Sequence, residues 1–261
     1  MKLGYLGPRG TFSHEAVKLI KNDKHDLIEF RTIRDVVDAL SNESIDEAII
    51  PIENSIQGEV RESIDSIIEK NNIYVIMEKG LPIVQNLLCD INNSEPITKI
   101  YSHTQAIAQC QKFIRENYPS AEIIDVSSTA TAAQSIVGKS GVACISNSAC
   151  ATEYNLKILN ESIQDNNQNV TKFWLLSRNK NTNGSKMSLV FSTKNTPGAL
   201  YKVLRIFYSY DINLTKIESR PAKTILGEYI FVIDIEINQF LETALKDLKE
   251  ECKYLKVLGI Y

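Results

Sequence analysis

The chain has 261 residues, of which 43% are hydrophobic and 23% charged, and its formal net charge is −3. This composition is typical of a soluble globular protein with one large or two modest domains. The sequence has no basic block and no apolar run long enough to cross a membrane, which argues against nucleic acid or membrane as a partner. The N-terminal MKLGYLGPRG lacks the long apolar region of a signal peptide, so we expect a cytoplasmic protein.

Strands and helices are predicted to alternate over the first 147 residues. The strands are expected at 2–7, 27–33, 47–53, 99–103, 122–128 and 141–147, the helices at 10–20, 33–40, 58–70, 104–117 and 129–137, and two extended segments within 73–90. This alternation favours parallel α/β layers.

A polar stretch, NKNTNGSK, follows Arg178 and is predicted to be a linker. Beyond it we expect strands at 187–194, 212–219, 228–237 and 254–260, with helices at 198–211 and 241–252. Their order is βαββαβ, the ferredoxin-like arrangement.

No known cofactor or metal motif occurs in the sequence. The five cysteines form no CxxC pair and none lies at metal-ligand spacing from a histidine, so they are predicted to be free, mostly buried thiols. The glycines of GYLGPRG are spaced GxxGxxG, unlike the dinucleotide fingerprint. We therefore expect no cofactor and no metal, and a general acid or base from Glu53, His103, a hydroxyl or water.

Five small polar segments follow predicted strands. They are Gly7 to Ser13, Pro51 to Val60, Ser102 to Gln105, Ser127 to Thr129, and Ser146 to Ser148. Ligands of parallel α/β sheets bind beyond the carboxyl ends of the strands, and helix N-termini bind carboxylates. Helix capping alone would explain any one segment. Five together favour a polar, anion-binding cleft.

The order and spacing of ten segments resemble bacterial prephenate dehydratases that carry a C-terminal ACT regulatory domain. The segments are GYLGPRGTFSHEA, VVDAL, PIENSIQGEV, LPI, YSHTQAIAQC, VSSTATAA, IQDNNQNVTKFWLL, NTPGAL, INLTKIESRP and YLKVLGIY. Two positions depart from the family pattern: Lys172 stands where Arg is usual, and Thr104 where Pro is common. Because an ammonium cannot reproduce the planar guanidinium fork, the role of residue 172 stays open.

The resemblance implies a two-lobed α/β catalytic domain, similar to type II periplasmic binding proteins, joined to a ferredoxin-like ACT domain. The catalytic domain would span 1–178, with lobes of about 1–80 plus 161–178, and 81–160. A linker at 179–185 would lead to the ACT domain at 186–261. The family also implies a homodimer or homotetramer.

The implied reaction converts prephenate to phenylpyruvate, carbon dioxide and water in L-phenylalanine biosynthesis. Thr171 is the implied proton donor, by resemblance and by its position after the polar run Asp165 to Asn169. Glu53 could instead orient its neighbours, since a carboxylate repels a dianion, and the two phenylalanines could be core residues. The expected substrate-binding residues are Thr11, Phe12, Glu53, Asn54, Ser55, His103, Gln105, Ser128, Thr129, Lys172 and Phe173.

The ACT domain implies L-phenylalanine as an inhibitory effector, bound between two copies of the domain. The segments NTPGAL and NLTKIESRP are expected to lie close in space, because one enters a helix and the other leaves it for an adjacent strand. The residues expected at this site are Pro197, Gly198, Ala199, Leu200, Asn213, Leu214, Glu218, Ser219 and Arg220.

Three other functions remain open from the sequence. One is a structural or scaffolding role, for which the sequence offers no long helix or repeat. Arogenate dehydratase activity would use the same site on an amino-bearing substrate, and an assay with both substrates distinguishes them. A non-catalytic amino-acid sensor would bind ligand without turnover. The threonine at 171 and the polar strand ends argue against the sensor.

Overall fold

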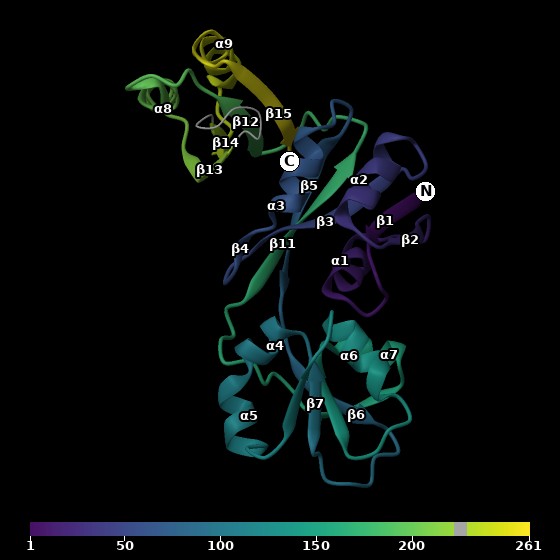
Figure 1. The fold of residues 1–261 in the computed structure, drawn as a ribbon. Helices are drawn as coiled ribbons and strands as arrows, with labels where there is room; N and C mark the ends of the chain where they lie inside the picture. The colour runs from purple at the N-terminus through teal and green to yellow at the C-terminus, as the bar shows by residue number, and fades with distance from the viewer. Residues whose placement is uncertain (222–228) are drawn as a thin grey trace.

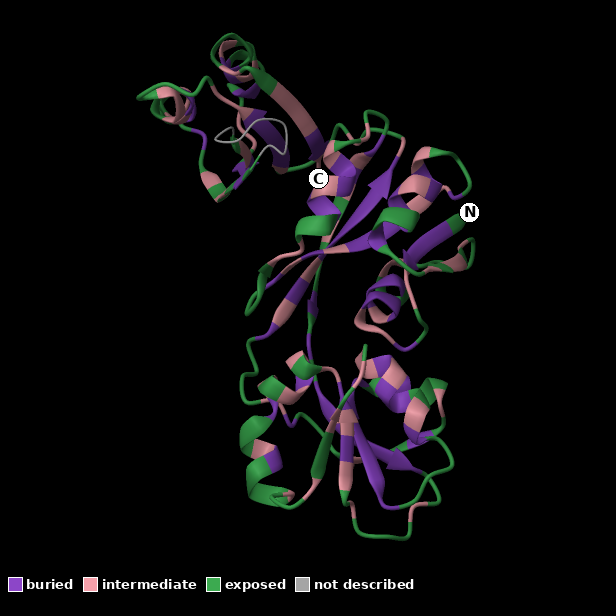
Figure 2. Ribbon diagram, viewed as in Figure 1, coloured by how far each residue is buried: buried purple, intermediate pink, exposed green. Residues whose placement is uncertain are grey.

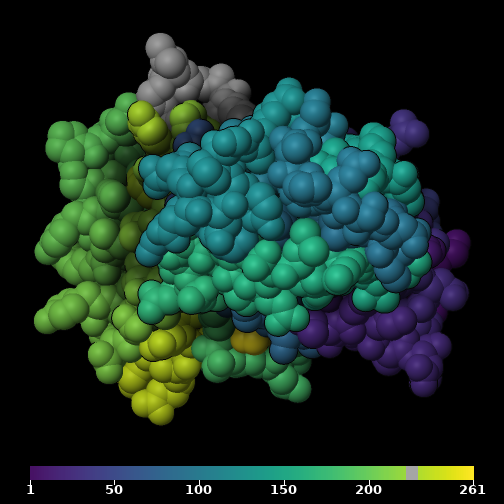
Figure 3. Space-filling view, turned by 90° about the horizontal axis from the view of Figure 1, so that it is seen from below, coloured from purple at the N-terminus to yellow at the C-terminus, as the bar shows by residue number. Residues whose placement is uncertain are grey.

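The computed structural model describes residues 1–221 and 229–261, which fold into three parts arranged along an elongated molecule (Figure 1). A first lobe occupies the middle, a second lobe one end, and the C-terminal domain the other. Seen from below, the second lobe lies in front and the C-terminal domain projects beside it (Figure 3). None of the described helices is long and apolar enough to cross a membrane.

The first lobe is built on the strand order β5-β11-β3-β1-β2. Its strands are β1 (Lys2–Leu6), β2 (Asp26–Phe30), β3 (Glu47–Asn54), β5 (Tyr74–Pro82) and β11 (Val170–Ser177), with the short β4 (Gly58–Glu59) paired to β3, and its helices are α1 (Phe12–Ile20), α2 (Ile33–Ser41) and α3 (Arg61–Ile68). Strand β11 returns from the second lobe and runs antiparallel to both of its neighbours. The residue that begins β11 therefore lies where the two lobes meet.

The second lobe has its own five-stranded sheet, in the order β10-β6-β9-β7-β8. The strands are β6 (Asn86–Asp90), β7 (Lys99–Ser102), β8 (Glu122–Asp125), β9 (Val142–Ser146) and β10 (Leu156–Asn160), and the helices are α4 (Thr104–Gln109), α5 (Gln111–Asn117), α6 (Thr129–Ile136) and α7 (Ser148–Glu153). Buried residues concentrate on β6 and β9, whereas much of α5 is exposed (Figure 2).

The prediction of one helix over 104–117 is wrong. The helix breaks at Cys110, whose backbone angles (φ −121°, ψ 17°) lie outside the helical range. The carbonyl of Gln109 accepts a hydrogen bond of 2.7 Å from the N–H of Asp165. This tertiary contact replaces a bond that would have continued the helix. Helix α7 and strand β10 were not predicted from the sequence.

The C-terminal domain has the predicted βαββαβ order. It consists of β12 (Lys186–Ser192), α8 (Ala199–Ser209), β13 (Leu214–Pro221), β14 (Tyr229–Glu236), α9 (Leu241–Glu251) and β15 (Tyr254–Ile260). Both helices pack against the sheet through a core that includes Phe191, Phe207 and Leu248. The predicted strand over 228–237 starts at Glu228, which lies outside the described residues.

The sheet of the C-terminal domain continues into the sheet of the first lobe. Strand β15 runs parallel to β5, with Gly259 paired to Val75, so the two sheets form one ten-stranded sheet. A side chain at residue 259 would overlap the backbone carbonyl of Val75. A glycine is needed at this position for the two backbones to approach.

Candidate active site

A cleft of about 330 Å³ separates the two lobes, and both contribute side chains to it. Its polar lining comes mainly from loops and helix starts at the carboxyl ends of β1, β3, β7 and β8, together with the first residues of β11. Four of the five polar segments noted in the sequence contribute to it. The fifth lies outside: Asn147 donates a 2.8 Å bond to the carbonyl of Gly10, and Ser148 lines a separate neighbouring cavity.

Most of the predicted substrate-binding residues meet in this cleft. The predicted site residues among its lining are Thr11, Phe12, Asn54, His103, Gln105, Ser128, Thr129, Thr171 and Phe173. Thr171 and Phe173 share the cleft face of β11, as the two-residue period of a strand requires. Glu53, Ser55 and Lys172 are not among the lining residues.

A β-bulge on β3 explains why Glu53 lies outside the cleft, whereas Lys172 lies outside because it alternates with Thr171 and Phe173 along β11. Phe173 pairs with Pro51 but Lys172 pairs with Glu53, so Ile52 is an extra residue on β3. A bulge reverses the facing of the side chains that follow it. The bulge therefore turns Asn54 into the cleft and Glu53 to the opposite face, where its carboxylate is 3.4 Å from the Lys172 ammonium.

Ser55 contacts the returning backbone rather than the cleft. Its hydroxyl accepts a 3.0 Å hydrogen bond from the N–H of Val170 and donates to the carbonyl of Gln168. The polar stretch before β11 is thus anchored to the loop after β3. This contact holds the start of β11 where the lobes meet.

Thr171 is held by a buried network of amides. The side-chain amide of Asn54 donates to Thr171 Oγ1 (2.9 Å) and to Asn169 Oδ1 (2.8 Å), so both of its N–H groups are used. The side-chain oxygen of Asn54, Oδ1, accepts hydrogen bonds from the backbone N–H groups of Ile56 and Gln57, which fixes the orientation of the side-chain amide. Because Thr171 Oγ1 accepts from Asn54, its own proton is available to a molecule in the cleft.

Three helices of the two lobes begin at the cleft. Thr11 caps α1, His103 caps α4 and Ser128 caps α6, each by accepting a hydrogen bond from a backbone N–H in the first turn. Capping and site formation therefore coincide at these residues. The first turns carry partial positive charge, which favours an anion.

The described lining of the cleft contains no Asp, Glu, Lys or Arg side chain. An anion bound there would be held by amides, hydroxyls, His103 and backbone N–H groups.

Burial raises the pKa of the Cys110 thiol to about 12 and that of Cys150 to about 11, which disfavours a thiolate nucleophile.

Sequence reasoning missed three glutamines of the lining, Gln57, Gln85 and Gln109. Gln85 is 3% exposed, and its Oε1 has no hydrogen-bond partner among the described residues. A buried, unsatisfied amide oxygen beside a cleft is suited to a substrate hydroxyl or water. The only sequence signal was its place in LPIVQNLLC, the first crossing between the lobes.

In the C-terminal domain, Gly198, Ala199 and Leu200 line a cavity of about 310 Å³ at the start of α8, together with Tyr229 and Phe231. Pro197 directly precedes this segment. Gly198 has a positive φ of 78°, which favours glycine.

Within one chain, the two effector segments lie close together only in part. Ser219 pairs with Phe231, which lines the cavity at the start of α8, whereas the first residues of the second segment lie farther away. Asn213 and Leu214 follow the far end of α8, and the helix between them and Gly198 is about 16 Å long at 1.5 Å per residue. Glu218 and Ser219 lie on β13. Arg220 points to the first lobe, where its guanidinium is 2.8 Å from the Asp65 carboxylate.

Comparison with known proteins matches both parts of the chain. Residues 3–181 match the family model described as prephenate dehydratase, and residues 187–253 match that of the ACT domain. A prephenate dehydratase of Lactococcus lactis subsp. cremoris is 40% identical over 100% of this chain and 97% of its own length. A bifunctional chorismate mutase/prephenate dehydratase of Aquifex aeolicus is 38% identical over 100% of this chain and 73% of its own.

A solved structure agrees with the sequence comparison. A prephenate dehydratase from Arthrobacter aurescens, determined in complex with L-Phe, is 30% identical, with a TM-score of 0.89 over 99% of this chain and 89% of that one. The fold and cleft thus define a two-lobed α/β lyase with a regulatory-type C-terminal domain. The chain belongs to the prephenate dehydratase family, with an ACT domain at its C-terminus, and its activity is that of a prephenate dehydratase.

Lys172, the departure from the usual arginine, allows a direct test. Its side chain is 43% exposed and pairs with Glu53 behind the cleft. We expect Lys172→Arg to retain most of the activity, because the guanidinium keeps the charge and can reach the same carboxylate. Steady-state kinetics with prephenate measure this. A folded but inactive variant would mean that the site requires an ammonium at this position.

Proposed function

We propose that Thr171 protonates the departing hydroxyl of prephenate in the cleft between the lobes. The observation that carries this assignment is the bond from the Asn54 amide to Thr171 Oγ1, which leaves the threonine O–H directed at a substrate. Thr171 is 9% exposed, so a short hydrogen bond to the substrate would be shielded from water. A weak acid of this kind acts through a bond that strengthens in the transition state.

The bonding changes of the reaction are simple. The carbon–carbon bond to the ring carboxylate breaks, its electron pair forms the new ring double bond, and the hydroxyl leaves as water after accepting a proton. Carbon dioxide and phenylpyruvate are the other products. Aromatisation drives the step, so the residues need only bind, orient and protonate.

The neutral cleft supports binding of a dianion by local dipoles. The starts of α1, α4 and α6, with Gln105 and the hydroxyls of Ser128 and Thr129, would hold the two carboxylates. Holding them in a site closed to water raises the energy of the ring carboxylate relative to the transition state. The test of the activity is phenylpyruvate absorbance with purified protein and either prephenate or arogenate. Turnover of arogenate alone would reassign the substrate.

We further propose that L-phenylalanine binds the ACT domain and inhibits. The cavity at Gly198 to Leu200 offers backbone N–H groups for a carboxylate and aromatic side chains for a ring. Because Asn213 lies at the other end of α8, a shared site needs a second copy of the domain, turned so that the two segments face each other. This requirement favours a homodimer or homotetramer. The domain bounds that we propose are 1–178 for the catalytic domain, 179–185 for the linker and 186–261 for the ACT domain. The proposed location is the cytoplasm.

Gly198→Val should abolish inhibition by L-phenylalanine without removing activity. A β-branched residue is strained at a φ of 78°, so the start of α8 that lines the cavity would have to change its backbone conformation. Asn213→Ala should weaken the same effect, since its amide would bond the amino-acid main chain. Calorimetric titration of wild type and both variants with phenylalanine measures binding directly. Unchanged binding in both variants, or no heat from wild type at millimolar ligand, would contradict the proposed site.

A further inference from the structure

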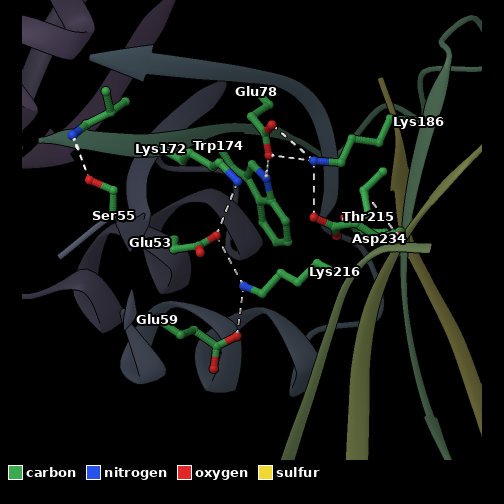
Figure 4. Close-up of polar contacts among 12 residues, drawn as sticks. Glu53, Ser55, Glu59, Glu78, Lys172, Trp174, Lys186, Thr215, Lys216 and Asp234 are labelled. Atoms are coloured by element: carbon green, nitrogen blue, oxygen red, sulfur yellow. Dashed lines mark hydrogen bonds and ion pairs between the residues drawn. The ribbon is translucent and has the colours of Figure 1, made fainter. Parts of the chain in front are cut away.

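A lysine of the ACT domain reaches into the catalytic domain behind the cleft. Lys216, on β13, is 13% exposed, and its ammonium lies 3.4 Å from Glu59 and 3.6 Å from Glu53 (Figure 4). The same oxygen of Glu53 is 3.4 Å from the Lys172 ammonium. Lys216, Glu53 and Lys172 thus form one continuous chain of ion pairs, which we call the rear ion chain.

The rear ion chain lies directly behind the proposed proton donor. Glu53 pairs with Lys172 across β3 and β11, and the next pair along the two strands is Asn54 with Thr171. The first pair faces the ACT domain, while the second faces the cleft. Any shift of Glu53 therefore moves the backbone of Asn54, whose amide holds Thr171.

The bulge at Ile52 interrupts the ladder between β3 and β11 one residue before Glu53. A bulge disrupts the ladder locally and bends the strand. Backbone bonds continue beyond it, because the N–H of Ser55 donates to the carbonyl of Val170 and the N–H of Val60 donates to the carbonyl of Ile52. The side-chain contacts on the rear face therefore add to these backbone bonds in fixing this part of β3.

The charges of the rear ion chain favour this role. Burial acts to raise the pKa of the Glu53 carboxyl, but the ammonium groups of Lys216 and Lys172 outweigh it and lower the pKa. Glu53 is therefore ionised at neutral pH. Lys172 is the more exposed of the two cations, so solvent screens its attraction to Glu53 more than it screens that of Lys216.

We propose that Lys216 is a positioning residue for the dehydratase reaction. Through Glu53, this ACT-domain side chain fixes the Asn54–Thr171 pair in the geometry that protonates substrate. The proposal rests on the proposed role of Thr171. It means that part of the catalytic geometry is supplied from outside the catalytic domain.

The test uses the full-length protein with Lys216→Met, which keeps the length of the side chain and removes the charge. We expect kcat to fall by about fivefold to tenfold with KM little changed, because ground-state binding does not use this contact. Lys216→Arg should recover most of the loss. Glu53→Gln should lower kcat similarly, and the Lys216→Met/Glu53→Gln double variant should lose less than the product of the two single effects.

The matched control is Lys186→Met. Lys186 is also an ACT-domain lysine at the interface, 20% exposed, but its ammonium bonds Glu78 and Asp234 rather than a residue of the rear ion chain (Figure 4). It should leave kcat near that of wild type, even where it lowers the melting temperature. An equal loss of kcat in both lysine variants would mean general loosening of the interface and would overturn the proposal.

Thr171→Ala, measured in parallel, separates this proposal from the one on which it rests. A severe loss in Thr171→Ala together with wild-type kinetics in Lys216→Met would overturn only the positioning role. Near wild-type kinetics in Thr171→Ala would instead exclude Thr171 as the proton donor and so overturn the proposed function. A loss in Lys216→Met that appears in KM alone would also overturn the positioning role.

Discussion

Thr171→Ala is expected to lower kcat by roughly 100-fold or more while KM changes little, because general acid help is typically worth about 10²–10⁴-fold. The hydroxyl accepts from Asn54 and has its proton free for the cleft. Its removal takes away an interaction made in the transition state rather than in substrate binding. Steady-state kinetics with prephenate, followed as phenylpyruvate formation, measure both constants.

Thr171→Ser is the matched control, since it keeps the hydroxyl and removes only a methyl group. It should retain far more activity than the alanine variant. Circular dichroism should show the same fold for both variants, because each substitution removes only a few atoms from one side chain at the start of β11. A kcat for Thr171→Ala within a few-fold of wild type would exclude the threonine as the donor.

Gly259→Ala is expected to lower the melting temperature by about 5–10 °C, the shift that a loss of about 2–3 kcal/mol gives in a chain of this size. The new methyl group would overlap the backbone of Val75, where no rotamer change can relieve it. Strands β5 and β15, which join the two sheets, would have to move apart at this point. Scanning calorimetry measures the effect.

Gly80→Ala, on β5 itself, is the control for this substitution. A Cβ there would meet only a methyl carbon of Val170, at 3.4 Å, which is ordinary contact. Its melting temperature should stay close to that of wild type. If the two variants melted alike, close packing at the join would not be what requires a glycine at 259.

The sequence predicted those helices and strands whose bounds are set by residues close together in the chain. The βαββαβ order was predicted from the succession of strands and helices after the linker, and both helices pack against the sheet. The helix over 104–117 was predicted too long because its break depends on Asp165, distant in sequence. Short α7 and β10 gave too little periodicity to be distinguished from loop.

The candidate site was predictable as a set of segments but not in its facing. Thr171, Asn54 and the helix starts meet in the cleft because strand ends lie together at one edge of each lobe's sheet, and both edges line the cleft. The facing of Glu53 depends on the bulge at Ile52, and the signal for it, a proline inside the strand at residue 51, was not used in the sequence prediction. Gln85 was missed because an amide in an extended crossing carries no motif.

The shared sheet has a consequence for synthesis of the chain. Strand β5 is made early, but the Val75 end of one of its edges is paired only when β15, the last described strand in chain order, is made. Until then the nascent first lobe carries an open edge, the kind of surface on which strands of other molecules add. A chain truncated inside the ACT domain would therefore keep an unpaired strand edge and tend to associate with other copies. The ACT domain thus shields the first lobe from self-association, in addition to lying next to its active site.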